Sequence, residues 1–266
     1  MSLVAADNRA RARLHADHLG SLKFLSVGRS DIGCVRKLNE DAFLERADMG
    51  LWAVADGMGG HDAGDIASAT VIESLKDVSS FRSAYAYRHA ACLALHGANA
   101  RLRERGDELG VDICGSTIAA LLVHQGHYAC LWAGDSRIYL YRDGEMRRLT
   151  RDHSVVQEMV DAGELNDDQA RMHRSRHVIT RAVGASETLQ LESAHGSVRA
   201  GDRFLLCSDG LTGPLRDGEL AEFMRRPPLE ASLDKMIAAA MVRGAPDNVT
   251  AVLVAAEAQN PCSVES

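Results

Sequence analysis

The spacing of apolar residues changes several times along the chain, and each change predicts a new element. In the first third, apolar runs or alternations predict strands over 22–27, 42–45 and 51–55. The spacing then becomes helical over about 64–78, where Ile66, Val71 and Leu75 share one face, and a second helical stretch covers about 83–105. The chain therefore starts with strands and continues with a pair of helices.

The second half also begins with predicted strands, and its helices come later. Three strands at short spacing, 116–123, 127–133 and 137–141, predict antiparallel neighbours joined by tight turns. Asp143-Gly144 separates the last of them from 145–149, and this dipeptide is typical of a hairpin turn. The remaining predicted elements are strands over 202–207 and 249–255 and helices over 218–226 and 229–243. Strands in runs and helices in pairs indicate an α+β layered fold.

The segment 151–181 interrupts this pattern, because its apolar density falls and Asp, His and Arg become frequent. We expect a surface flap there, whose arginines and His177 contact substrate or solvent. The chain shows no repeat or linker, so one catalytic domain is predicted over 22–257. Residues 1–21 lack the continuous apolar stretch of a secretory signal, and we expect them to form an N-terminal tail. Residues 258–266 are expected to form a C-terminal tail.

Charge and composition narrow the classes of partner. The 266 residues include 30 Lys and Arg against 37 Asp and Glu, a formal charge of −7, which disfavours a nucleic acid or an anionic membrane surface as partner. No apolar run approaches the roughly 18 residues of a membrane span. The 6 cysteines show no C-x-x-C spacing, so we expect reduced thiols in a cytoplasmic protein.

Four short stretches carry the candidate chemistry, since each joins apolar residues to acids. They are Asn39-Glu40-Asp41, Ala55-Asp56-Gly57, Ser208-Asp209-Gly210 and Pro246-Asp247-Asn248. Each alone is explained by a turn or a helix cap. Together they exceed what turns require, and carboxylates that meet in one place need the counter-charge of a divalent ion such as Mg²⁺ or Mn²⁺. Arg36, close before Glu40 and Asp41, has the planar fork that holds two phosphoryl oxygens.

Eight motifs in order resemble those of the protein phosphatase 2C family, most closely its bacterial serine/threonine phosphatases. They are Arg36-Lys37-Leu38-Asn39-Glu40-Asp41, Val54-Ala55-Asp56-Gly57-Met58-Gly59-Gly60-His61, Gly115-Ser116-Thr117, Ala133-Gly134-Asp135-Ser136-Arg137, Leu149-Thr150-Arg151-Asp152-His153, Ile179-Thr180-Arg181-Ala182-Val183-Gly184, Ser208-Asp209-Gly210-Leu211 and Asp247-Asn248-Val249-Thr250. Each motif is short, but the ordered series is specific and covers about 22–255. The resemblance implies a four-layer α-β-β-α sandwich of two mainly antiparallel sheets, with metal ions at one edge.

The resemblance also implies roles for individual residues. Asp56 would bridge two Mn²⁺ or Mg²⁺ ions, the Gly57 carbonyl would complete one shell, and Asp209 and Asp247 would hold the other ion. Asp135 matches the position that, with Asp209, holds a third, weaker ion in bacterial members, although a turn between two strands also explains it.

Two further acids and one arginine complete the implied site. Glu40 and Asp41 would bind or orient metal waters, and Arg36 would grip the phosphoryl group. Met58 stands where many eukaryotic relatives have a histidine proposed as general acid, and it cannot donate a proton. A metal-bound water is therefore the expected proton donor, with His61 as the alternative.

The implied activity is hydrolysis of phosphoserine and phosphothreonine in proteins by a metal-bridging hydroxide, opposing a serine/threonine kinase that shares these substrates. Two alternatives stay open at this point. One is a catalytically silent phosphoprotein-binding module, which would be expected to lack the metal carboxylates. The other is a metal-dependent phosphodiesterase or nuclease, which the acidic balance disfavours.

Overall fold

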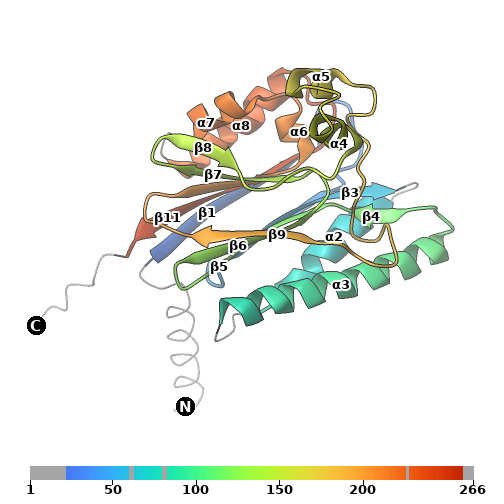
Figure 1. The fold of residues 1–266 in the computed structure, drawn as a ribbon, viewed down its shortest axis with the longest axis horizontal. Coiled ribbons are helices and arrows are strands. Elements are labelled where there is room, and N and C mark those ends of the chain that lie inside the picture. The colour runs from blue at the N-terminus through green and yellow to red at the C-terminus, as the bar shows by residue number, and fades with distance from the viewer. Residues whose placement is uncertain (1–21, 60–62, 80–82, 226–227, 260–266) are drawn as a thin grey trace, which may run out of the picture.

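Two antiparallel sheets face each other, and helices cover their outer faces (Figure 1). The computed structural model describes residues 22–59, 63–79, 83–225 and 228–259. One sheet has the order β1 (Leu22–Asp31), β11 (Val249–Ala258), β10 (Arg203–Cys207), β7 (Arg137–Arg142) and β8 (Glu145–Arg148). The other has the order β2 (Asp41–Arg46), β3 (Leu51–Gly59), β5 (Ile118–His124), β6 (His127–Ala133) and β9 (Glu192–Ser197), with β4 (Cys114–Ser116) paired to β3. The predicted α-β-β-α sandwich is confirmed.

The central strands are buried on both faces, which explains their continuous apolar runs. In β3, Trp52 and Val54 pack between the sheets, whereas Leu51, Ala53 and Ala55 pack under helices. Those helices are α2 (Ala63–Lys76) and α3 (Ala84–Leu109). On the other side, α7 (Asp217–Met224) and α8 (Leu229–Val242) cover the sheet that contains β11. Three apolar layers thus hold two rigid sheets in register.

Most predicted elements are present, with ends that differ by a few residues. Helix α3 runs to Leu109 and not to 105, and it ends at Gly110, whose φ of 65° is the left-handed cap that glycine favours. The Asp143-Gly144 hairpin is confirmed by φ values of 53° and 88°. The predicted strand 116–123 is divided into β4 and β5, because Thr117 lies between two different pairings of β3.

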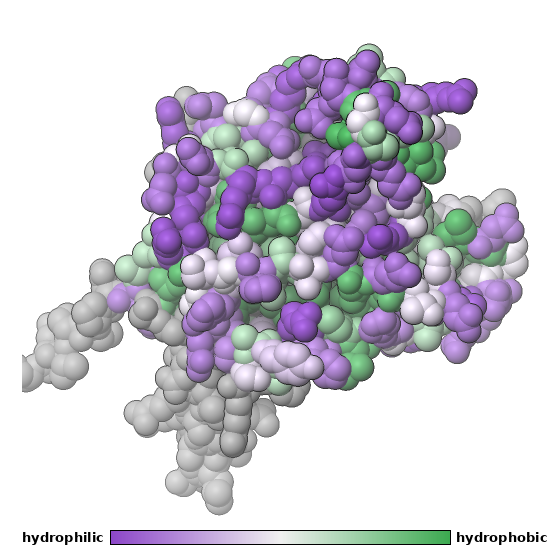
Figure 2. Space-filling model, in the orientation of Figure 1, coloured by the Kyte–Doolittle hydropathy of each residue, from purple (hydrophilic) through white to green (hydrophobic). Residues whose placement is uncertain are grey.

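The predictions missed one strand and three short helices. Strand β9 forms the edge beside β6, and its composition of Glu, Ser, Ala, His and Gly gives no apolar signal. The flap contains α4 (Val155–Asp161) and α5 (Asp167–Met172), and α6 (Asp209–Thr212) follows β10. In Figure 1 the flap lies beside α6, and Figure 2 shows that hydrophilic residues predominate over this part of the viewed face.

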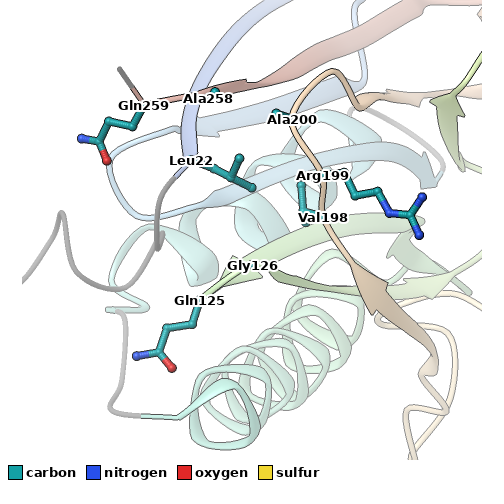
Figure 3. A pocket seen from close by; sticks show the side chains of 8 residues that line it. All are labelled: Leu22, Gln125, Gly126, Val198, Arg199, Ala200, Ala258 and Gln259. Atoms are coloured by element: carbon teal, nitrogen blue, oxygen red, sulfur yellow. The ribbon is translucent and has the colours of Figure 1, made fainter. Parts of the chain in front are cut away.

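Of the predicted tails, only Ala258 and Gln259 lie among the described residues. Ala258, placed in the C-terminal tail 258–266, instead ends β11 and pairs with Leu22. A shallow hollow lies at this end of the sheets, between Leu22, Gln125, Arg199 and Gln259 (Figure 3). Residues 1–21 and 260–266 lie outside the described residues. Within the described ranges, no helix combines the length and apolarity that crossing a bilayer requires.

Candidate active site

Five aspartates from both sheets converge at one edge of the sandwich. Asp41 begins β2 and lies opposite Asp56 of β3 in the strand register. Asp135 occupies the β6–β7 turn, Asp209 is the first residue of α6 after β10, and Asp247 precedes β11. Burial raises the pKa of Asp56 most, and the other four aspartates all raise it further through charge repulsion. The structure therefore brings together side chains that lie up to about 200 residues apart in the chain, as their placement at strand ends predicts.

Asp56 is fixed through its backbone by a motif that sequence analysis quoted without assigning it a role. Its N–H donates to Thr117 Oγ1 at 2.9 Å, and its carbonyl accepts from Thr117 N–H at 2.8 Å and from Ser116 Oγ at 3.0 Å. Thr117 Oγ1 also lies 2.8 Å from Ser136 Oγ, beside Asp135. Ser116 and Thr117 thus tie Asp56 to the turn that carries Asp135.

Asn248 performs the corresponding task for the loop between β1 and β2. Its Oδ1 accepts from Glu40 N–H at 2.8 Å, and its Nδ2 donates to the carbonyls of Ile32 and Leu38 at 2.8 and 3.0 Å. One amide side chain next to Asp247 therefore holds both ends of the loop that carries Arg36. These contacts join residues more than 200 positions apart in the sequence. The local sequence motifs therefore do not predict them.

Glycines allow the backbones to approach closely at this edge. A Cβ on Gly57 would lie 1.9 Å from Gly64 O and 2.8 Å from Glu40 O, and Gly57 N–H donates to Glu40 O at 3.0 Å. A Cβ on Gly64 would lie 2.1 Å from Glu40 Oε1. Strand β3, the start of α2 and the Glu40 loop thus meet where only glycine fits.

Burial and mutual repulsion disfavour the ionised carboxylates. Desolvation is the main cause that raises the pKa of Asp41 to about 7, with Asp209 and Asp247 adding repulsion and hydrogen bonds from Thr250 and Ser208 opposing it. Desolvation also raises the pKa of Asp56 and of Asp135. The ionised form of such a cluster is stable only when bound cations neutralise its charge.

The donor atoms fit hard divalent ions. Asp41 Oδ1 and Asp209 Oδ1 are buried without a hydrogen-bond partner, so both oxygens have lone pairs to offer. Within the described ranges, no three His, Cys, Asp or Glu side chains close around one ion position. An ion here would complete its shell with a carbonyl and waters, as Mg²⁺ commonly does.

Arg36 and the flap border the aspartates. Arg36 Nη2 donates to Asp247 Oδ2 at 2.8 Å, and this bond raises the pKa of the half-exposed guanidinium. His177 Nδ1 of the flap lies 3.4 Å from Asp209 Oδ2, and its side chain is half-exposed. His61, the alternative proton donor, lies outside the described residues.

His153 anchors the flap to the Asp135 turn. Its Nδ1 accepts from Gly134 N–H at 3.2 Å and its own N–H donates to Gly134 O at 2.9 Å. Its carbonyl accepts from Thr180 N–H at 2.7 Å, so one residue connects both ends of the flap to the turn. Arg171 of α5 adds a second anchor by donating to the carbonyls of Thr212 and Gly213 behind α6.

The raised pKa of Asp41 predicts a pH-dependent stability of the metal-free protein. Because the carboxyl titrates near 7 when folded and near 3.8 when unfolded, the native state holds the extra proton between these values. The free energy of unfolding should therefore fall by a few kcal/mol as pH rises from 4 to 7. Asp41→Asn should flatten this slope in urea titrations with EDTA, whereas Asp112→Asn, an exposed control, should not. A slope unchanged in Asp41→Asn would contradict the prediction.

The comparisons with known proteins agree on one family. The model of the family described as "Protein phosphatase 2C" matches residues 31–254. Serine/threonine protein phosphatase PstP of Mycobacterium tuberculosis is 38% identical over 231 residues, which cover 85% of this chain and 44% of PstP. Serine/threonine phosphatase stp of Listeria monocytogenes is 31% identical over 242 residues, covering 85% of this chain and 93% of stp. The chain thus spans less than half of PstP and nearly all of stp.

Solved structures give the same result. PppA, described as a key regulatory component of T6SS in Pseudomonas aeruginosa, superposes with a TM-score of 0.82 at 41% identity, covering 88% of this chain and 97% of PppA. The catalytic domain of PstP in complex with two manganese ions superposes with a TM-score of 0.81 at 34% identity, covering 89% of this chain and 99% of that domain.

Proposed function

The chain belongs to the protein phosphatase 2C family, and from this premise we propose that it is a metal-dependent phosphatase of phosphoserine and phosphothreonine in proteins. The observation that carries the proposal is the convergence of five aspartates beside Arg36 at one sheet edge. Carboxylates that repel one another when bare, next to a guanidinium, suit a site that takes divalent cations and a phosphoryl dianion together.

We propose that Asp56, Asp209, Asp247 and the Gly57 carbonyl hold two Mn²⁺ or Mg²⁺ ions, and that Glu40 and Asp41 orient water around them. The unpartnered Oδ1 atoms of Asp41 and Asp209 support this assignment. Asp135, with Asp209, is proposed for a third, weaker ion, which its burial and repulsion with Asp209 support. When bound, such ions lower the pKa of water and neutralise charge on phosphoryl oxygens.

The protein's own groups would then position the substrate. Arg36 lies close enough to the aspartates to exchange its bond with Asp247 for two bonds to phosphoryl oxygens, which fixes the phosphorus for in-line attack. Met58 has no proton to give to the leaving alkoxide. Water is the proposed donor, and His61 is the alternative.

Arg36→Ala tests the positioning role. Loss of a charged hydrogen-bond donor to the phosphoryl group should lower kcat/KM on a phosphothreonine peptide about ten- to hundredfold. Arg29→Ala is the matched control, because Arg29 also forms an exposed ion pair, at 2.9 Å, but its partner is Asp234 of α8 and not one of the five site aspartates. Equal losses in both variants would argue against a substrate contact by Arg36.

The activity itself is tested by release of phosphate from a phosphothreonine peptide with Mn²⁺, with EDTA, and with Mn²⁺ restored. We expect release that depends on the ion and returns with it. Faster hydrolysis of bis(p-nitrophenyl) phosphate would instead indicate a phosphodiesterase. No hydrolysis of either compound would indicate a binding module.

We also propose the protein partners and the cellular location of this chain. Its substrates would be phosphorylated proteins, and a serine/threonine kinase that phosphorylates the same proteins would oppose it. We propose a cytoplasmic location, which is supported by the free thiols of Cys34, Cys92, Cys114, Cys130 and Cys207.

A further inference from the structure

A second hollow is lined by residues at the start of α3, in the β5–β6 hairpin and near the end of β9. Figure 1 shows these elements lying together at one end of the sandwich. Its volume is about 410 Å³, within the range of small-molecule sites. Three histidines from three strands line it, His124, His127 and His195, and helix α3 adds Tyr85, Tyr87 and Arg88. Nothing in the proposed phosphatase mechanism uses these residues.

The strand register explains why the imidazoles meet. His124 of β5 pairs with His127 of β6, and His195 of β9 pairs with Ala129 of β6. Residues opposite each other, or two apart on one strand, share a sheet face, so all three histidines face α3. His124 is only 4% exposed and forms the floor with Tyr87, whereas His127 and His195 are exposed at the rim.

The charge of this hollow differs from that of the whole chain. The formal charge of the protein is −7, yet none of the described residues that line the hollow is Asp or Glu. Arg88 supplies a permanent positive charge, and its guanidinium carbon lies 5.8 Å from the Tyr85 ring centroid. The imidazoles add N–H donors. Flat aromatic walls combined with cationic and N–H groups suit a ring that carries an acidic group.

We propose that this hollow binds a small organic anion built on a planar ring. The site is separate from the aspartates: His124 ends β5, whereas the Asp56 contact Thr117 directly precedes Ile118 at its start. Seven residues of extended strand put about 20 Å between them. A ligand in the hollow therefore leaves the phosphoryl site open.

Naphthalene-1-sulfonate is a suitable probe, because no phosphatase can hydrolyse it, and naphthalene-1-methanol is its neutral counterpart. Both are titrated into the full chain loaded with Mg²⁺, and binding is followed by amide NMR shifts and calorimetry. We expect saturable shifts at 122–129 and 193–196 with the sulfonate, and at least tenfold weaker binding of the alcohol.

Two variants and one control test whether the positively charged and imidazole side chains of the hollow bind the sulfonate. Arg88→Ala and His195→Ala should each weaken sulfonate binding about tenfold while phosphatase activity stays unchanged. Arg101→Ala removes the same charge from an exposed position on the same helix and should change neither. Equal binding of sulfonate and alcohol, shifts confined to the aspartate edge, or equal weakening by Arg101→Ala would overturn the proposal. Because phosphatase activity is measured separately, failure of the binding proposal is distinguishable from failure of the phosphatase assignment.

Discussion

Asp56→Asn should abolish phosphatase activity and at the same time stabilise the metal-free protein above neutral pH. The activity loss, at least about a thousandfold, follows because a residue proposed to hold the ions would lose its charge, and two bound ions would stabilise the transition state by several kcal/mol. The stability gain follows from the raised pKa of Asp56: desolvation and four neighbouring aspartates make its ionised form unfavourable in the fold. A neutral amide avoids this cost, since the backbone bonds to Thr117 remain.

Opposite changes in activity and stability distinguish a functional carboxylate from a structural one. The measurements are phosphate release with Mn²⁺ and thermal unfolding with EDTA at pH 8. Asp143→Asn is the matched control, because Asp143 begins the exposed hairpin turn with φ of 53°, a conformation that asparagine also adopts readily. The control should leave both quantities unchanged. Activity retained in Asp56→Asn, or a lower melting temperature without metal, would contradict the assignment.

The apolar pattern predicts most of the fold because burial on both faces produces long apolar runs. Strand β3 is buried on both faces up to Ala55, and its run is visible in the sequence. Edge strand β9 is partly exposed along its whole length, and Ala194 is its one apolar side chain, so no apolar periodicity marks it. The sandwich itself followed from the resemblance, because periodicity does not specify how two sheets stack.

The residues of the candidate site also fall into two groups, those that the sequence predicts and those that it does not. Acid-bearing strand ends are local signals, and the ordered motifs indicated Asp56, Asp209 and Asp247 before any contact was known. The residues that hold these acids in place depend on long-range contacts: Ser208 Oγ donates to Asp41 Oδ2 at 2.8 Å across 167 positions. The histidines of the second hollow share a face only through strand register. Local pattern predicts which groups do chemistry, whereas tertiary contact decides which groups support them.

Gly57→Ala should destabilise the protein by about 3 kcal/mol and reduce activity about a hundredfold. The added Cβ would lie 1.9 Å from the carbonyl oxygen of Gly64, and backbone cannot move aside as a flexible side chain can. Strand β3 and the start of α2 would have to separate. That movement would displace Asp56 from Asp41, its partner in the strand register, and break the bond from Gly57 N–H to Glu40 O.

Gly97→Ala provides the contrast, because the chemical change is identical and only the surroundings differ. Gly97 lies inside α3, and its added Cβ would have only Arg101 Nη1 nearby, at 3.7 Å. Alanine there should raise the free energy of unfolding by about 0.5 to 1 kcal/mol through its better helix propensity. Urea unfolding of both variants measures the opposite signs, and phosphate release should be normal only in Gly97→Ala. A Gly57→Ala protein as stable as the wild type would mean that β3 and α2 can separate without cost, so that their close contact would not be what holds Asp56 in place.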